Sequence, residues 1–145
     1  MCLAGASGAG AELLAAEPHP DLRVYYVWVP MLPPDDEAAA DAVAARFAEP
    51  RALHYWDGER RLARELATAL RISARDSIGA GAGPGFAWDV YLAYAQGALD
   101  LARPAFWMHQ LAATHAPRLD AAVFREQVRR LLVAPPPTYP AEGQA

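Results

Sequence analysis

The chain has 145 residues, of which 54% are apolar, so it is long and apolar enough for one ordinary domain with a single core. Its formal net charge is −4, which argues against a nucleic-acid partner, because phosphate binding depends on clustered cations. The single cysteine, Cys2, excludes an internal disulfide and a cysteine-cluster metal site.

The first residues differ from a secretory signal, since they lack a basic segment and Glu12 and Glu17 interrupt the apolar run. No stretch approaches the ~20 apolar residues that a bilayer-spanning helix needs. We therefore expect a soluble, cytoplasmic protein with no membrane partner. All 13 basic residues are arginine, and with the abundant alanine and proline they indicate the codon bias of a GC-rich, bacterial genome.

The first predicted elements are a helix, a strand and a second helix. Helix-forming residues at Ala11–Ala16 end at the stretch "EPHPD". The stretch "RVYYVWVPM" predicts a strand over Val24–Val29 that is apolar on both faces, as is typical of a central strand in a parallel sheet. Either Asp35 or Asp36 can cap the next helix, which we expect to run to about Ala48.

A second strand and a third helix follow. The stretch "RALHYW" predicts a short strand over Arg51–Trp56, and Asp57 is a suitable N-cap for the helix after it. The apolar side of that helix carries leucines spaced four residues apart, namely Leu62, Leu66 and Leu70.

The last part of the chain predicts two strands, a helix and a tail. The stretch "AWDVYLAY" predicts a strand over Ala87–Tyr94, and Gln96-Gly97 offers a turn into a short fourth strand around Ala98–Leu101. Apolar spacing predicts a helix over about Asp120–Leu132. The Pro-rich residues 134–145 are typical of a disordered tail.

Strands that alternate with helices and end in a hairpin indicate an α/β or α+β sandwich with a mixed sheet. Of these two classes we expect α/β. We also expect a single domain over residues 1–133, followed by the tail.

Three stretches resemble the thioredoxin-like superfamily, especially its peroxiredoxin-like and thiol-disulfide reductase-like branches. They are "VYYVWVPMLPPDDEAAADAVAARFAEP", "HYWDGERRLARELATALRI" and "AWDVYLAYAQGA". The likeness covers roughly Cys2 to Leu101 and lies in pattern and spacing. It implies a three-layer sandwich built on a mixed sheet.

The chain departs from that family at three places. Gly5 stands where the second cysteine of the family's Cys-x-x-Cys motif would be, so this motif is degenerate. Trp88 or Asp89 stands where the family has a cis-proline. The family has a central strand just before the first cysteine, of which only Met1 remains. The resemblance therefore implies a sheet whose first central strand is lacking or replaced, for example by a partner chain.

Cys2 is the candidate catalytic residue that the resemblance implies. A thiol at a helix N-terminus has a lowered pKa, because the helix dipole and free N–H groups stabilise the thiolate. The alternative is an inert or vestigial thiol, since nearby glycines weaken the first helical turn and chain ends are mobile. A reactive Cys2 would need an external thiol to resolve its mixed disulfide.

Trp88 and Asp89 are the candidate substrate-binding residues. The resemblance implies that this face, with the surrounding aromatic residues, receives an extended peptide or a thiol substrate. A carboxylate at Asp89, flanked by Trp88 and Tyr91, could have a raised pKa and act as an acid or base. The simpler interpretation is a residue at the start of a strand that bonds to backbone or to an arginine.

The remaining polar and glycine-rich features predict no cofactor. The four histidines form no ligand set with carboxylates, so we expect surface or core histidines: His19, His54, His109 and His115. The Gly-rich runs Gly5–Gly10 and Gly79–Gly85 lack the strand-to-helix context of a phosphate loop. We expect plain flexible loops at both, with neither a metal nor a cofactor.

Three functions therefore stay open. The first is a thioredoxin-like protein that uses one cysteine for thiol-dependent redox chemistry, with a thiol or a protein disulfide as partner. The second is a non-catalytic binding or dimerisation module of the same fold, in which a homodimer is possible. The third is an N-terminally truncated thiol-disulfide oxidoreductase. Whether the chain is an enzyme depends on Cys2.

Overall fold

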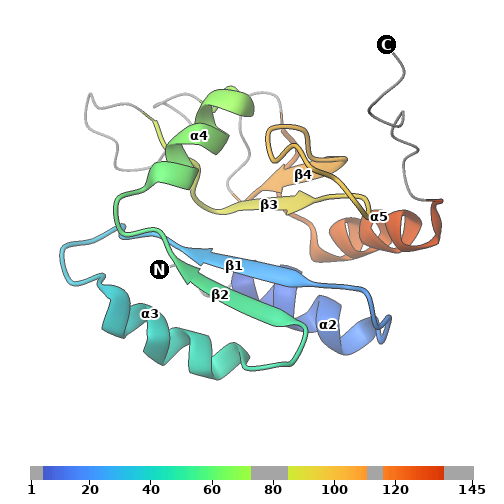
Figure 1. The fold of residues 1–145 in the computed structure, drawn as a ribbon, viewed down its shortest axis with the longest axis horizontal. Coiled ribbons are helices and arrows are strands. Elements are labelled where there is room, and N and C mark those ends of the chain that lie inside the picture. The colour runs from blue at the N-terminus through green and yellow to red at the C-terminus, as the bar shows by residue number, and fades with distance from the viewer. Residues whose placement is uncertain (1–4, 73–84, 111–115, 136–145) are drawn as a thin grey trace, which may run out of the picture.

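The computed structural model describes residues 5–72, 85–110 and 116–135 (Figure 1). The predictions for Cys2, for His115, for most of the second Gly-rich run and for most of the Pro-rich tail lie outside these residues. In chain order the elements are η1 (Ala6–Ala11), α2 (Glu12–Ala16), β1 (Val24–Trp28), α3 (Glu37–Ala44), η2 (Ala45–Phe47), β2 (Ala52–Trp56), α4 (Arg61–Ala69), β3 (Val90–Ala93), β4 (Phe106–His109) and α5 (Ala121–Val133).

The first two strands form a parallel pair. β1 and β2 run side by side in a register that joins Val24 to Ala52 and Trp28 to Trp56. The chain returns from one strand to the other through α3 (Figure 1). This arrangement confirms both predicted strands and the helix between them. It is the connection that parallel neighbours need, because a tight turn cannot join them.

The last two strands form an antiparallel pair, in which Val90 faces His109 and Ala93 faces Phe106. The fourth strand predicted around Ala98–Leu101 is wrong, because that strand is β4, which begins at Phe106. Residues 96–104 instead form turns. Gly97 has a φ of +77°, and the Asp100 carboxylate accepts a hydrogen bond from the backbone N–H of Ala102.

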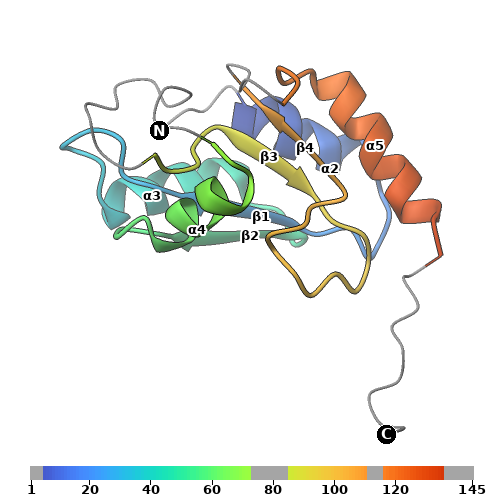
Figure 2. The same cartoon turned by 90° about the horizontal axis from the view of Figure 1, so that it is seen from above.

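The described strands form two sheets of two strands each, so the single mixed sheet that we expected is wrong. Figures 1 and 2 show the spatial order β2, β1, β3, β4, with β1 and β3 running in opposite directions. No hydrogen bond between described residues joins β1 to β3. The mixed α/β class is confirmed.

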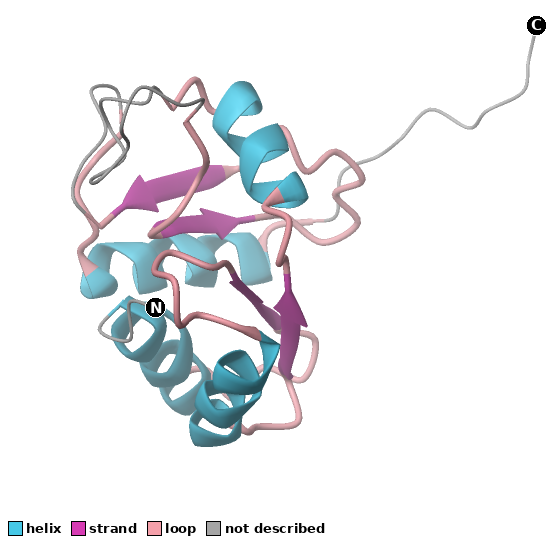
Figure 3. Cartoon of the chain, turned by 90° about the vertical axis from the view of Figure 1, so that its left-hand side faces the viewer, coloured by secondary structure: helices cyan, strands magenta, loops and turns pink. Residues whose placement is uncertain are grey.

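The helices lie on both sides of the strands (Figure 3). On one side, η1 and α3 cover the Tyr26 and Trp28 side chains of β1, and α5 covers the second pair. On the other side, α4 packs against the opposite face of β3 and β4 through Leu70 and Trp107. The opposite face of β1 has no such cover, so Tyr25 is 61% exposed and Val27 is 37% exposed. The prediction that β1 is buried on both faces is therefore wrong.

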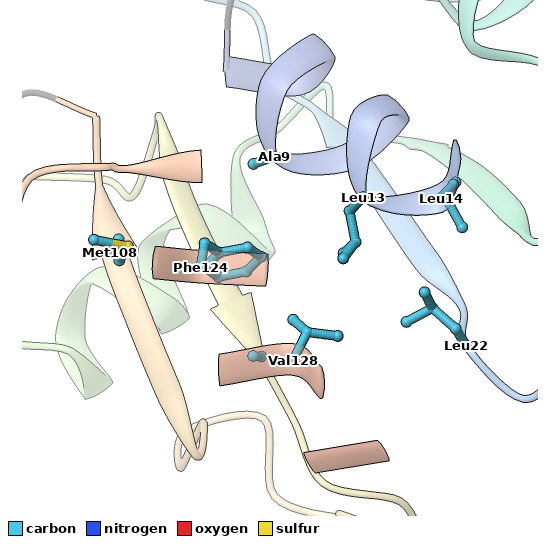
Figure 4. Packing of buried hydrophobic residues seen from close by; sticks show 8 residues of the cluster. Ala9, Leu13, Leu14, Leu22, Met108, Phe124 and Val128 are labelled. Atoms are coloured by element: carbon cyan, nitrogen blue, oxygen red, sulfur yellow. The ribbon is translucent and has the colours of Figure 1, made fainter. Parts of the chain in front are cut away.

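The largest cluster of buried side chains connects the two strand pairs (Figure 4). Leu13 and Leu14 of α2 contribute to it, together with Phe124 and Val128 of α5. Val24 of β1 and Tyr91 and Ala93 of β3 belong to or pack against this cluster. The two pairs therefore share one core although no backbone hydrogen bond connects them.

The first Gly-rich run is helical, which corrects the prediction of a flexible loop. It forms η1, a π-helical turn that leads directly into α2. A Cβ atom added at Gly10 would overlap the Tyr26 hydroxyl and would lie 2.6 Å from the ring carbon that bears it. The Tyr26 hydroxyl donates to the carbonyl of Ala6 at 3.4 Å. Burial, with a smaller contribution from Glu49, raises the pKa of Tyr26 to about 12, so the hydroxyl stays a donor.

Aspartates lie at the starts of three helices. Asp36 accepts from the N–H of Ala39 at the start of α3, and Asp120 accepts from two N–H groups at the start of α5. Asp57 is not the N-cap that we predicted for α4, because that position is Arg60, but from three residues further back it accepts from the N–H of Arg61 at 2.7 Å and from that of Ala63 at 3.0 Å. These carboxylates satisfy N–H groups that have no partner within the helix.

Candidate functional site

The candidate nucleophile itself lies outside the described residues, but the chain three positions after it is placed. Gly5 is buried, and its backbone packs directly against the Tyr91 hydroxyl of β3. A Cβ atom at Gly5 would overlap that hydroxyl and would lie 2.6 Å from Oε1 of Gln110. A larger residue at this position, where the thioredoxin-like motif would have its second cysteine, would therefore force the Tyr91 and Gln110 side chains to move.

Gly5 belongs to a group that we call the Asp89 corner, which consists of Gly5, Trp88, Asp89, Tyr91 and Gln110. The Tyr91 hydroxyl donates to Oε1 of Gln110 at 3.0 Å. The backbone N–H of Gln110 donates to the carbonyl of Asp89 at 2.9 Å. A continuous series of contacts therefore connects the start of the described chain to the start of β3.

Asp89 has a φ of +52°, in the left-handed region that residues other than glycine rarely adopt. It comes immediately before β3, so the interpretation as a residue at the start of a strand is confirmed in position. Its carbonyl group holds the end of β4 through Gln110. Non-glycine residues held at positive φ are often found at functional sites, where the surrounding structure keeps the backbone strained.

Trp88 provides a buried hydrogen-bond donor. Within the described part of the chain, its indole Nε1 is shielded from solvent and has no acceptor. A buried donor without a partner costs about 1–3 kcal/mol. Because this nitrogen is shielded, an acceptor oxygen or sulfur from outside can pair with it only after the surrounding residues move.

Trp88 and Asp89 are adjacent in the chain, and the structure adds Tyr91 and Gln110 to them through the contacts at Gly5 and at the Asp89 carbonyl. From the sequence, Tyr91 was placed beside Asp89 without a role, and Gln110 carried no signal at all. Gln110 joins the corner only because β4 pairs with β3 in this register. No pattern within the sequence gives that register, since the expected partner strand was a different segment.

The described histidines do not form a metal site. His109 is fully buried and is therefore a core histidine, whereas His19 lies in the half-buried loop before β1. His54 stacks on Tyr26 with ring centroids 4.8 Å apart and accepts from the Trp28 indole at its Nδ1. In the described ranges, no three histidine, cysteine or carboxylate side chains come together as metal ligands.

A hollow of about 380 Å³ lies away from the Asp89 corner. It is formed by the end of α4 and the turn before β4, and its lining includes Arg71, Arg103 and Trp107. Arg103 pairs with Asp100 there at 3.3 Å. The lining includes none of the five residues of the corner, so the hollow and the corner are separate features.

No helix among the described residues is long and apolar enough to cross a bilayer. Comparisons with protein-family models, with curated proteins and with solved structures give no match. The evidence for the candidate site is therefore its own geometry. The site combines a strained aspartate, an indole donor and a tyrosine–glutamine pair around the start of the described chain.

Proposed function

We propose that this chain is a thioredoxin-like domain that uses Cys2 for thiol exchange at the Asp89 corner. The observation that carries the proposal is the contact of Gly5 with Tyr91 and Gln110. Cys2 is three residues along the chain from Gly5, and Gly5 contacts the end of β3 that follows Trp88 and Asp89. The mixed α/β class, with helices on both sides of the strands, supports the fold part of the proposal.

The chemistry needs one cysteine of this chain and two partners. The Cys2 thiolate attacks one sulfur of a partner disulfide, forms a mixed disulfide and releases the other sulfur as a thiolate. An external thiolate then attacks the partner's sulfur in the mixed disulfide. This step regenerates the Cys2 thiolate and leaves a new disulfide between the partner and the external thiol. The Trp88 N–H can bond an acceptor of the partner in these steps once the residues that shield it move.

The test is the alkylation rate of the single thiol as a function of pH. We expect the rate to follow a Cys2 pKa below about 7.5, in the range of activated cysteines. We also expect glutathione disulfide to form one mixed disulfide per chain, detected by mass spectrometry. Cys2→Ser is the blank for both readouts. Trp88→Phe keeps the ring but removes the donor, and it should slow mixed-disulfide formation more than alkylation.

An alkylation midpoint near the ordinary cysteine value of about 8.5, with no mixed disulfide, would reject thiol exchange and leave the fold untouched. The second candidate function, a non-catalytic binding module, would then remain. A specific observation favours it, namely the uncovered apolar face of the first strand pair, where Tyr25 and Tyr55 are 61% and 52% exposed and stack on each other.

A further inference from the structure

The hollow beside α4 is a second candidate site, and it has about 380 Å³ of space. That volume lies within the range of small-molecule sites, which is about 300–1,000 Å³. One wall is the end of α4, and the other is the turn that leads into β4. The lining is apolar at Leu70, Pro104 and Trp107 and positively charged at Arg71 and Arg103, and none of the described residues that line it is acidic. The hollow therefore has the composition of a site for an anion that carries an apolar group.

Arg71 occupies a backbone position at which glycine is the usual residue. The N–H of Ile72 donates to the carbonyl of Ala67 at 2.8 Å, and the N–H of Arg71 donates to that of Thr68 at 3.2 Å. These two bonds form a Schellman motif, and Arg71 has a φ of +55° at its left-handed position. A Cβ atom is strained in that conformation, which is why glycine is preferred there. The turn itself therefore does not explain the presence of an arginine.

Arg60 has the same left-handed backbone, but its side chain has structural partners. Its Nε donates to the carbonyl of Pro30 at 2.8 Å, and its guanidinium lies 4.6 Å from the centroid of the Phe86 ring. The Arg71 guanidinium makes no hydrogen bond or ion pair within the described chain. It is also not needed to cap α4, because the carbonyls of residues 66–68 already accept from backbone N–H groups. The charge of Arg71 is therefore available to a ligand.

Arg103, on the wall formed by the turn, has only an exposed partner. Its Nε lies 3.3 Å from the Asp100 carboxylate, and the two side chains are 87% and 58% exposed. An exposed ion pair of this kind contributes little to stability, so an anion can replace the carboxylate at small cost. The carboxylate itself stays in place, because it also accepts from the N–H of Ala102.

Two arginines beside apolar residues define the chemistry of the ligand. Guanidinium groups bind phosphate and carboxylate oxygens through paired N–H donors. A phosphate monoester carries close to two negative charges at pH 7, so it matches two arginines better than a single carboxylate does. The indole ring of Trp107, together with Leu70 and Pro104, offers a surface for a planar apolar group next to the phosphate.

We propose that the hollow between α4 and the turn before β4 binds a small phosphate monoester whose ester group is planar and apolar. The phosphate pairs with Arg71 and Arg103, and the planar group packs against Trp107. Arg71 stands at a strained position because binding needs its charge. The site shares no residue with the Asp89 corner and does not depend on thiol exchange by Cys2.

The test is a titration of the full, 15N-labelled chain with phenyl phosphate, followed by nuclear magnetic resonance. We expect the amide signals of Arg71 and Ala102 and the indole signal of Trp107 to shift together, with a Kd of about 1 mM for a ligand of this size. Benzoate has the same ring with one charge, and inorganic phosphate has the charge without the ring. Both should bind about fivefold more weakly. Phenol has the ring without the charge and should give no saturable shift.

Arg71→Gly separates binding from stability. Glycine relieves the left-handed strain, so the unfolding temperature should stay at or above that of the wild type. Binding of phenyl phosphate should nevertheless weaken by about fivefold or more, and Arg103→Gln, which leaves the helix end untouched, should weaken it by a similar factor. Arg64→Gln is the matched control. It removes an exposed charge from α4 outside the lining, so the Kd should change less than about twofold.

Asp100→Asn tests the site in the opposite direction. The amide oxygen can still accept from the N–H of Ala102, but the charge that competes for Arg103 is gone. Phenyl phosphate should therefore bind about two- to threefold more tightly.

Three outcomes would overturn the proposal. The first is no saturable shift at Arg71, Ala102 and Trp107 even well above the expected Kd. The second is an equal loss of affinity in Arg71→Gly and Arg64→Gln, which would show that the general charge of α4 attracts the anion. The third is equal affinity for phenyl phosphate and inorganic phosphate, which would show that the apolar wall takes no part. None of these results bears on the alkylation rate of Cys2, so thiol exchange is tested separately.

Discussion

At Gly5 and Gly10 the backbone of the first helical run lies against a tyrosine side chain. Tyr91 contacts Gly5, and Tyr26 contacts Gly10. From the sequence, the glycines indicate a flexible loop, because glycine is a poor helix former. In the structure the run is helical, and each of the two glycines lets a tyrosine ring come close to the backbone. Such a requirement depends on a residue from a distant strand, so local pattern could not reveal it.

Gly10→Ala should destabilise the protein by about 1–3 kcal/mol, because the added methyl overlaps the buried Tyr26 ring. Gly8→Ala is the matched control. Its Cβ would meet only the Cβ of Ala121 at 3.8 Å, so it should be neutral or stabilise by up to about 1 kcal/mol. Urea unfolding of both variants measures the difference. Equal effects at the two positions would contradict the close approach of Tyr26.

Asp35 is the residue from which we expect a pH dependence. Its carboxylate accepts hydrogen bonds from the N–H groups of Leu32 and Met31, and these bonds, with that of Leu32 first, lower the pKa of Asp35. The folded pKa lies below the unfolded one. The stabilisation is therefore complete above the ordinary aspartate pKa and is lost as the pH falls through the folded value.

Asp35→Asn should accordingly cost about 1 kcal/mol at pH 7, a value reduced by solvent screening, and less at pH 2. Urea unfolding of the wild type and the variant at both pH values checks this. Asp41→Asn, on the exposed side of α3, removes the same charge as a control. A cost at Asp35 that is the same at pH 2 and pH 7 would show that the carboxylate charge does not matter.

At the level of elements, most of the structure could be predicted. Residue composition gave β1, β2 and α5 to within a residue or two, and the aspartates at 36, 57 and 120 marked helix starts. These signals are local, because capping and apolar periodicity act within one or two turns. The position of β4 was mispredicted because the turn after β3 is longer than the two-residue hairpin that Gln96-Gly97 suggested.

Arg51 illustrates a contact between elements that no local signal predicts. From the start of β2, its guanidinium donates to the carbonyls of Leu14 at 2.7 Å and Glu17 at 2.5 Å, where α2 ends. It also pairs with Glu49 at 2.8 Å. One side chain therefore satisfies the open end of α2 and holds that helix against the first strand pair.

Arg51→Lys should lower the free energy of unfolding by about 1–3 kcal/mol, because an ammonium group cannot reach both carbonyls and the carboxylate together. Arg61→Lys provides the control. Its pair with Glu59 is about three-quarters exposed on both sides, so the change should be below about 0.5 kcal/mol. Urea unfolding compares the two variants. A cost at Arg51 as small as that at Arg61 would show that the end of α2 is satisfied by water.

At the level of the whole molecule, the sequence predicted the strands but not how they assemble. The continuous apolar run of β1 indicated a strand buried on both faces, and the structure leaves one face uncovered. An apolar run predicts a strand, but it does not say which face of that strand another element covers, because the covering element comes from elsewhere in the sequence. The same limit explains why Gln110 of the candidate site could not be found.

If the shared core is what holds the two strand pairs together, a cavity within it should loosen both. Leu13→Ala should cost about 2–5 kcal/mol, and it should speed amide exchange at Tyr26 in β1 and at Tyr91 in β3 by similar factors. Leu70→Ala removes a buried leucine from the cluster between α4 and the second pair, so its effect should be larger at Tyr91 than at Tyr26. Exchange that accelerates in only one pair for Leu13→Ala would mean that the pairs are stabilised independently.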